Sequence, residues 1–307
     1  MKHLTVGIFH DETLGRELGK KGTESDILMF NRKTDDCIYT FMAPVGDKIT
    51  VKSQIALSID AAIVVCQEMT PDVGETVLLL DAVGIKHGII VMPPFSDQTS
   101  ASKMLAGTSL AAFPILDRNI PLILSKLDSF NPTPNDDSPT IVVVDHSFHV
   151  NGVGEVILGF VKQGVVHKHD KLVLLPNTKE VVVRSIQMQD KEFEEAAAGS
   201  RVGLAIKDAT LDDLPRGAML CAPQAAFTTT AITLSFVKNR YYQSLREGLF
   251  HLIVGMQMTP ATILKTHNGT LALRTEKQIG YRKDDLFILL DLNARKLHFM
   301  GSGKIAS

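Results

Sequence analysis

The pattern of apolar residues changes on either side of one short segment, residues 131–139. This segment reads Asn-Pro-Thr-Pro-Asn-Asp-Asp-Ser-Pro and has the turn-forming, charged composition of a linker. Before it, apolar runs of strand length alternate with runs of helical spacing, whereas after it only short strand-like runs occur. A chain of 307 residues divided in this way is long enough for two or three separate cores.

The part before the linker predicts alternating strands and helices, which is the pattern of an α/β domain. Residues 10–33 are polar and rich in glycine, and we expect residues 19–23 within them to form an exposed turn. Strands are predicted at residues 4–9, 37–42, 61–66 and 88–92, and helices at residues 51–58, 71–83 and 119–127.

The part after the linker predicts small β-barrels, because its strands are short and separated by turn residues. The expected strands are residues 140–144, 154–161, 171–175, 181–187 and 201–206, and a second all-β unit begins near residue 228. We therefore predict four parts: an α/β domain at 1–130, the linker at 131–139, a barrel at 140–222 and a C-terminal barrel at 223–307.

The charge balance bears on which partners the chain can attract, and the cysteines bear on the compartment. The chain has 32 Lys and Arg against 34 Asp and Glu, so its overall field does not attract nucleic acid, and any RNA contact has to be local. Cys37, Cys66 and Cys221 are widely spaced, which indicates reduced core thiols. No apolar run approaches the ~18 residues of a membrane span. We expect a cytoplasmic protein with neither a membrane nor a DNA partner.

A resemblance to a known family becomes specific between residues 145 and 220. The matching motifs, in order, are Asn-Gly-Val-Gly-Glu-Val at 151–156, Gly-Phe-Val-Lys-Gln-Gly-Val at 159–165, Asp-Lys-Leu at 170–172, Val-Arg-Ser-Ile-Gln at 183–187, Glu-Ala-Ala-Ala-Gly-Ser-Arg-Val-Gly-Leu at 195–204 and Arg-Gly-Ala-Met-Leu at 216–220. This stretch closely resembles the second domain of the elongation factor Tu family, in its archaeal and selenocysteine-specific branches. The glycines of the first motif suit the positive φ angles of a tight hairpin.

The flanking parts resemble the same translation-factor GTPase superfamily. Residues 43–47, 59–65, 80–85 and 89–91 follow the frame of its nucleotide domain, and residues 227–234 and 286–303 resemble its other barrel more loosely, with an unrelated barrel as the alternative. The resemblance implies a degenerate P-loop-type α/β domain followed by barrels of the domain II and domain III types.

The phosphate-binding loop of that family has no good counterpart. A P-loop needs glycines, a Lys for the phosphates and a Ser or Thr hydroxyl for Mg²⁺. Setting Gly15 and Arg16 on the Gly-Lys pair places Glu17 at the hydroxyl position, and Asp11 and Glu12 add negative charge. Gly15 and Arg16 are therefore only vestigial candidates.

The other two nucleotide motifs are also altered. The magnesium-linked Asp falls at Met42 or Ala43, and the motif's His falls at Val45, Gly46 or Asp47. At the guanine motif, Pro94 and Phe95 replace Asn and Lys, while Asp97 keeps a carboxylate. The first switch segment also looks short. Gly46 and Asp97 complete the vestigial set, and we expect no GTP or Mg²⁺ cofactor and no hydrolysis.

In the family, the domain II barrel holds the aminoacylated 3′ end of tRNA. The resemblance carries this surface to Asp145, to Glu194 or Glu195, and to Arg201, while Val144 and Phe160 depart from the family pattern. Phe160 either stacks on a base or covers the barrel.

Four histidines lie close together in sequence: His146, His149, His167 and His169. His169 falls where the family often has a turn glycine, and histidine tolerates the left-handed region, so we predict a structural role. Metal binding by this group is left open.

Three functions compete. The first is a translation-associated protein that kept the three-domain shape, lost the GTP switch, and contacts a tRNA acceptor end or the ribosome through its barrels. The second is a GTP-binding elongation factor with a non-standard nucleotide loop. The third is a protein-interaction adaptor.

Overall fold

The computed structural model describes residues 1–46, 48–94, 97–132 and 135–306. The chain divides into two compact units. The first unit comprises Met1–Pro132, Val237–Ser244 and Ile288–Ser302, and the second comprises Thr133–Phe236, Leu245–Phe287 and Gly303–Ser307.

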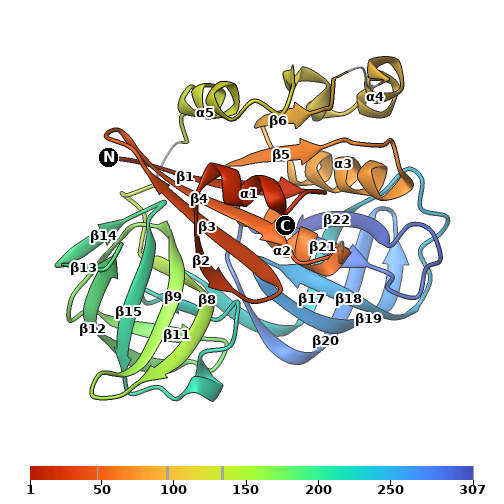
Figure 1. Ribbon diagram of the computed structural model, residues 1–307. Helices are drawn as coiled ribbons and strands as arrows, with labels where there is room; N and C mark the ends of the chain where they lie inside the picture. The colour runs from red at the N-terminus through yellow and green to blue at the C-terminus, as the bar shows by residue number, and fades with distance from the viewer. Residues whose placement is uncertain (47, 95–96, 133–134, 307) are drawn as a thin grey trace. The chain divides into compact units, whose positions relative to one another are not determined.

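A seven-stranded sheet organises the N-terminal part of the first unit (Figure 1). Its order is β2-β3-β4-β1-β5-β6-β7, with parallel pairing from β4 across to β7 and antiparallel pairing of β3 with both β2 and β4. The strands are β1 (Lys2–Phe9), β2 (Lys20–Glu24), β3 (Ile27–Lys33), β4 (Cys37–Pro44), β5 (Ala61–Val65), β6 (His87–Val91) and β7 (Ile115–Leu116).

Helices cover both faces of this sheet. On one face, α1 (Thr13–Leu18) and α5 (Ile120–Asp128) bury leucines and isoleucines against alternate residues of β1, such as Val6 and Ile8. The opposite face of β1 meets α2 (Ile49–Ala56), since a Cβ on Gly7 would lie 3.0 Å from Ile55. Beside α2 lies α3 (Pro71–Val83), and α4 (Gln98–Leu105) and the 3₁₀ turn Ser109–Ala112 lead to β7.

Two strands lie between residues 19 and 33, where the sequence predicted none. The predicted exposed turn at 19–23 is wrong, because residues 20–24 form β2, which pairs with β3. β2 is mostly exposed and polar, so it lacks the apolar alternation that marks a half-buried strand. The strand β3 was also missed, although Ile27 to Phe30 are all buried.

The second unit contains a barrel, here called the first barrel, with a separate short ribbon of β10 and β14. Its ring runs β11-β16-β8-β9-β15-β12 and closes where β11 pairs with β12. Gly152 and Gly154 adopt φ angles of 81° and 103°, which confirms the predicted hairpin. The strands are β8 (Ile141–Val150), β9 (Gly154–Gln163), β10 (Val165–His167), β11 (Lys171–Leu175), β12 (Lys179–Met188), β13 (Lys191–Phe193), β14 (Glu195–Ala197), β15 (Arg201–Lys207) and β16 (Met219–Cys221).

The C-terminal strands close into a further barrel, here called the second barrel, in the order β17-β20-β19-β18-β21-β22. They are β17 (Phe227–Lys238), β18 (Gly248–Val254), β19 (Gln257–His267), β20 (Thr270–Tyr281), β21 (Phe287–Leu290) and β22 (Phe299–Ile305). The predicted fold class, an α/β domain followed by two β-barrels, is thereby confirmed.

Cys37, Cys66 and Cys221 are buried free thiols, as predicted. Within the described parts of the chain, we find no helix that combines the length and apolar character of a membrane span.

Candidate functional site

The junction between β1 and α1 is where a phosphate-binding loop is expected, and the protein's own charges fill it. One oxygen of Asp11 accepts the Thr13 backbone N–H at 2.9 Å and the Thr13 hydroxyl at 2.5 Å. Arg118, which follows β7, pairs with the other oxygen of Asp11 and also contacts Glu17 at 2.7 Å. A carboxylate of the chain thus takes the anion position at the start of this helix.

The protonation of Asp11 reflects these contacts. Burial works to raise its pKa, but the hydrogen bonds from Thr13 and Arg118 outweigh it and hold the pKa below the usual value. Asp11 therefore stays charged at neutral pH, and it repels a phosphate that approaches the same backbone N–H groups.

Gly15 and Arg16 lie within α1 and not in an open loop. A Cβ on Gly15 would lie 2.4 Å from the Phe30 ring, so glycine here lets α1 pack directly onto β3. Arg16 is exposed in the last turn of α1. The local packing explains the glycine without a bound phosphate.

The last residues of β4 offer apolar side chains at the expected magnesium position. Met42 and Ala43 are both fully buried. Gly46 adopts φ 64° in an exposed turn, and Asp47 lies outside the described residues.

Asp97 begins α4. Its carboxylate accepts the backbone N–H groups of Thr99 and Ser100, each at 3.0 Å, and the Ser100 hydroxyl at 2.5 Å. These hydrogen bonds lower its pKa, with the Ser100 hydroxyl making the largest contribution. Pro94 is exposed, and Phe95 lies outside the described residues. Beside Asp97 lies an open cavity of about 280 Å³, lined by Gln67, Glu68, Met69, Met92, Asp97 and Ser100.

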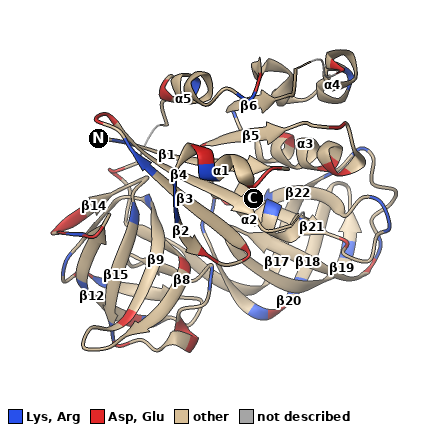
Figure 2. Ribbon diagram, in the orientation of Figure 1, with Lys and Arg blue, Asp and Glu red and all other residues tan. Residues whose placement is uncertain are grey.

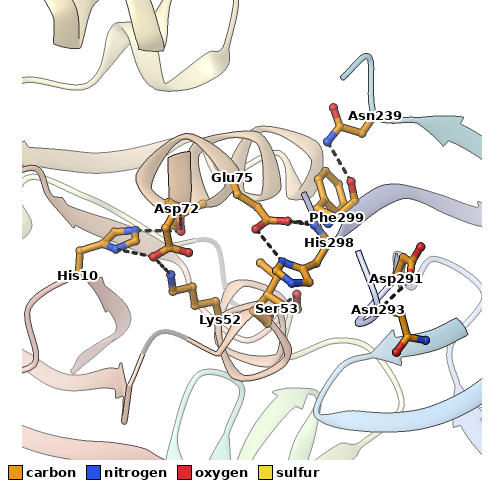
Figure 3. A network of polar contacts seen from close by, with 12 residues as sticks. His10, Lys52, Ser53, Asp72, Glu75, Asn239, Asp291, Asn293, His298 and Phe299 are labelled. Carbon is orange, nitrogen blue, oxygen red and sulfur yellow. Dashed lines mark hydrogen bonds and ion pairs between the residues drawn. The ribbon is translucent and has the colours of Figure 1, made fainter. Parts of the chain in front are cut away.

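A polar network at the carboxyl end of β1 was not expected from the sequence (Figure 3). Lys52 on α2 is fully buried and donates to Asp72 on α3 at 2.7 Å. His10, at φ 69°, places one ring nitrogen 3.3 Å from Asp72 and the other 2.9 Å from the Thr76 hydroxyl. Asp72 thus stands between two basic side chains, with 39% of its own side chain exposed.

A second network joins α3 to the start of β22 (Figure 3). Glu75 is 4% exposed, and one of its oxygens accepts the backbone N–H groups of His298 and Phe299, each at 2.6 Å. Its other oxygen lies 3.3 Å from the His298 ring. These contacts satisfy a carboxylate that would otherwise be buried at high cost.

The first barrel brings three of its five candidate residues together. Asp145 lies at a bulge of β8, where the register with β9 shifts between Val144 and His146, and it is 3% exposed. Arg201 contacts the Asp145 carboxylate at 3.2 Å and lies over the Phe160 ring, 5.9 Å from its centroid. Phe160 is 4% exposed, so its ring covers the barrel wall in this structure.

Glu194 and Glu195 do not join that group; they lie at the separate ribbon of β10 and β14. Glu195 begins β14, which pairs with β10 and sets Glu195 opposite His167. The two side chains approach to 3.3 Å, and Glu194 approaches Lys168 to the same distance. Both glutamates are strongly exposed.

The four histidines do not converge. His169 adopts φ 72°, which confirms its predicted turn role. His146 lies beside the Phe148 ring, while His149 contacts Glu155 at 3.1 Å. Nowhere among the described residues do three or more His, Cys, Asp or Glu side chains form a group able to hold a metal ion.

Sequence reasoning missed Arg118 and the pairing of Lys52 with Asp72. Arg118 is 107 positions from Asp11, and neither residue belongs to a motif that links them. Lys52 carried a weak signal, since a lysine within an apolar helical run has to find a partner when the helix is buried.

Known proteins resemble this chain both in sequence and in fold. Residues 154–221 match the family model described as Elongation factor Tu domain 2. An uncharacterized protein of Methanocaldococcus jannaschii is 36% identical over 310 residues, covering 99% of this chain and 100% of that protein. Elongation factor 1-alpha of Pyrobaculum calidifontis is 35% identical over 101 residues, covering 33% of this chain and 23% of that protein.

Two solved structures share the fold. Translation elongation factor SelB of Methanococcus maripaludis, in complex with the GTP analogue GppNHp, has a TM-score of 0.86 at 23% identity, covering 100% of this chain and 79% of that one. A bacterial selenocysteine-specific elongation factor has a TM-score of 0.82 at 21% identity, covering 99% and 58%. With the sequence matches, these place the chain in the translation-factor GTPase superfamily, in one family with the full-length relative from M. jannaschii.

Proposed function

We propose that this chain is an elongation-factor-like RNA-binding protein of translation that has lost the GTP switch. In this proposal the first barrel contacts the acceptor end of a tRNA, or ribosomal RNA, and the α/β domain serves as a scaffold without a nucleotide. The fold is that of translation elongation factors, residues 154–221 match their second domain, and the chemistry of the nucleotide cleft is what sets this chain apart.

The observation that carries the proposal is the occupation of the β1–α1 junction by Asp11. Its carboxylate already accepts the Thr13 N–H, and Arg118 pairs with both Asp11 and Glu17. To bind there, a phosphate has to displace a charge-assisted ion pair and then lie beside two carboxylates. Each such contact is worth about 1.5–3 kcal/mol, so the exchange is unfavourable.

Magnesium fits no better. A nucleotide-bound Mg²⁺ needs a hydroxyl from the loop and a carboxylate from the strand end. In the described part of this cleft, those positions carry Glu17 and the buried Met42 or Ala43. The residues present do not fit a magnesium–nucleotide pair.

The RNA side of the proposal rests on the charge at the Asp145 bulge. Arg201 contacts the Asp145 carboxylate, and Arg216 donates to the Asp145 backbone carbonyl at 3.2 Å. Two guanidinium groups thus lie at one bulge of the barrel. A guanidinium group suits a phosphate next to an unpaired 3′ end.

Two measurements test the proposal. Calorimetry with GTP and Mg²⁺ is expected to give no binding at micromolar ligand. Capture of the tagged protein from its native extract, followed by sequencing of bound RNA, is expected to enrich tRNA or ribosomal RNA. Recovery of proteins without RNA would favour the adaptor function instead.

One observation favours the second candidate, a GTP-binding factor with a non-standard loop. The cavity of about 280 Å³ has the exposed carboxylate of Asp97 in its wall, and a carboxylate at this place suits a purine amine. Micromolar, magnesium-dependent GTP binding that is lost in Asp97→Ala would establish that candidate.

A further inference from the structure

Positive charge is concentrated in one part of this nearly neutral chain. Residues 223–307 carry eleven Lys and Arg against five Asp and Glu, whereas the whole chain has 32 against 34. Figure 2 marks Lys and Arg in blue and Asp and Glu in red on the ribbon. The C-terminal barrel sequence is therefore basic, and the rest of the chain is acidic.

Two loops of the first unit carry part of this charge and lie side by side. One is Val237–Ser244, at the end of β17, and the other is residues 291–298, between β21 and β22; we call them the basic loop pair. Asn239 is buried and donates from its side chain to the Phe299 carbonyl at 3.0 Å. The Tyr242 hydroxyl donates to Asp291 at 2.8 Å.

The basic loop pair presents cations and one aromatic ring to solvent. Arg240, Arg295 and Lys296 are exposed, and Tyr241 is 63% exposed. The Arg240 guanidinium lies 4.9 Å from the centroid of the Tyr241 ring. Asp291, the one acid in these loops, is 6% exposed and accepts from Tyr242, so it offsets little of the outward charge.

The loops are also held in shape before any ligand arrives. The Tyr241 backbone N–H donates to the Asn239 side chain at 3.1 Å, and the Lys238 ammonium donates to the carbonyls of Asn239 and Tyr242. These hydrogen bonds order the loop around Tyr241, so its exposed ring can stack with little further ordering of the loop.

We propose that the basic loop pair binds a single-stranded stretch of RNA, with a base on the Tyr241 ring and phosphates on Arg240, Arg295 and Lys296. Single-strand sites combine a cationic track with an aromatic stacking platform, and both are present here. An acidic peptide would contact the cations and would have no use for the exposed Tyr241 ring. The choice of RNA over DNA rests on the proposed function. The location of the surface rests only on the exposed cations and the Tyr241 ring.

The test uses the full chain and a 12-nucleotide oligouridine in fluorescence anisotropy. Tyr241→Ala is expected to weaken binding about 5- to 150-fold, the range for loss of one stacked base. Arg240→Ala is expected to lower the slope of log affinity against log salt by about 0.7, the value for one phosphate contact on a single strand. Lys171→Ala, an exposed lysine of β11 in the second unit, is the charge-matched control and should match the parent.

Tyr241→Phe separates stacking from other roles of the side chain. The chain has no tryptophan and four tyrosines, so RNA stacking on Tyr241 is expected to quench the tyrosine fluorescence of the parent. The Phe variant should keep the affinity and lose that quenching. The inference is overturned if the parent ignores oligouridine, if Tyr241→Ala binds like the parent, or if polyglutamate competes as well as RNA does. None of these outcomes bears on acceptor-stem binding by the first barrel.

Discussion

The carboxylate of Glu75 accepts the backbone N–H of Phe299 at 2.6 Å, joining residues 224 positions apart in the chain. The same oxygen accepts the His298 N–H, so one buried side chain satisfies two backbone donors where β22 begins. Phe299 is buried, so its N–H has no other acceptor at hand, and the contact holds residues 298 and 299 against α3.

Substitution of Glu75 measures this contact. Glu75→Ala leaves one buried and one part-buried N–H group without an acceptor, and we expect the free energy of unfolding to fall by about 2–5 kcal/mol. Glu75→Gln keeps one acceptor oxygen, and we expect a loss of about 1–2 kcal/mol. Urea denaturation followed by circular dichroism gives both values. Equal losses in the two variants would show that the hydrogen bonds are not what stabilises this contact.

The Arg201–Asp145 pair predicts non-additive stability. Arg201→Ala removes a partner from a carboxylate that is 3% exposed, so we expect a loss of about 3–5 kcal/mol. Adding Asp145→Asn removes the unpaired charge and should restore part of the loss. The four proteins of this cycle are compared by urea denaturation, and simple additivity would contradict the pairing.

The Arg201→Ala variant also tests RNA binding by the first barrel. Arg201→Ala is expected to weaken acceptor-stem RNA about 10- to 150-fold at moderate salt, the loss of one charge-assisted contact. Arg201→Lys keeps the charge and serves as the matched control. Parent-like affinity in Arg201→Ala would move the RNA contact away from this bulge.

The elements that were predicted correctly are those whose ends are marked by nearby residues in the sequence. The bounds of α3 were predicted correctly because Thr70 caps its start, Pro71 follows, and Gly84 ends it in the left-handed region at φ 79°. In contrast, β2 has only polar and glycine residues, and its pairing with β3 comes from tertiary context. The helix α4 was also missed, since its start depends on the Asp97 side chain and its apolar face is short.

The site was less predictable than the fold. Sequence motifs showed that the nucleotide chemistry of the family is altered, but they gave no sign of what replaces it. Arg118 reaches Asp11 only because β7 and β1 end at the same edge of the sheet. Contacts of this kind depend on three-dimensional closure and leave no spacing in a single sequence.

The cysteines predict a dependence on alkaline pH. Burial raises the pKa of Cys66 to about 11 and that of Cys221 to about 12 from a usual 9.0. A raised folded pKa means that the contribution to stability is complete below about pH 9 and is lost as the pH rises toward 11–12. We expect no reaction with a thiol reagent at pH 8 without denaturant, and three reactive thiols in urea. Cys66→Ala should flatten the alkaline limb of the stability curve.

Asp11 predicts a loss of stability at acid pH. Its folded pKa lies below the usual 3.8, so its contribution is present above that value and is lost as the pH falls through the folded pKa. Arg118→Ala removes one cause of the lowering. We expect the variant to be less stable than the parent at pH 6, and the two unfolding curves to converge as the pH falls through the folded pKa of Asp11. Curves that stay parallel would show that Arg118 does not act through Asp11.

The last prediction concerns the switch itself, which needs a phosphate cradle, a magnesium site and a segment ordered by the γ-phosphate. Here Asp11 and Glu17 occupy the cradle with Arg118, and the strand end offers Met42 or Ala43 to magnesium. Losing two charge-assisted contacts weakens binding by about two to four orders of magnitude. A ligand that does not discriminate between two states cannot shift their balance. Small-angle scattering profiles with GTP, with GDP and without nucleotide are therefore expected to superimpose, and a magnesium-dependent change in profile would restore the switch.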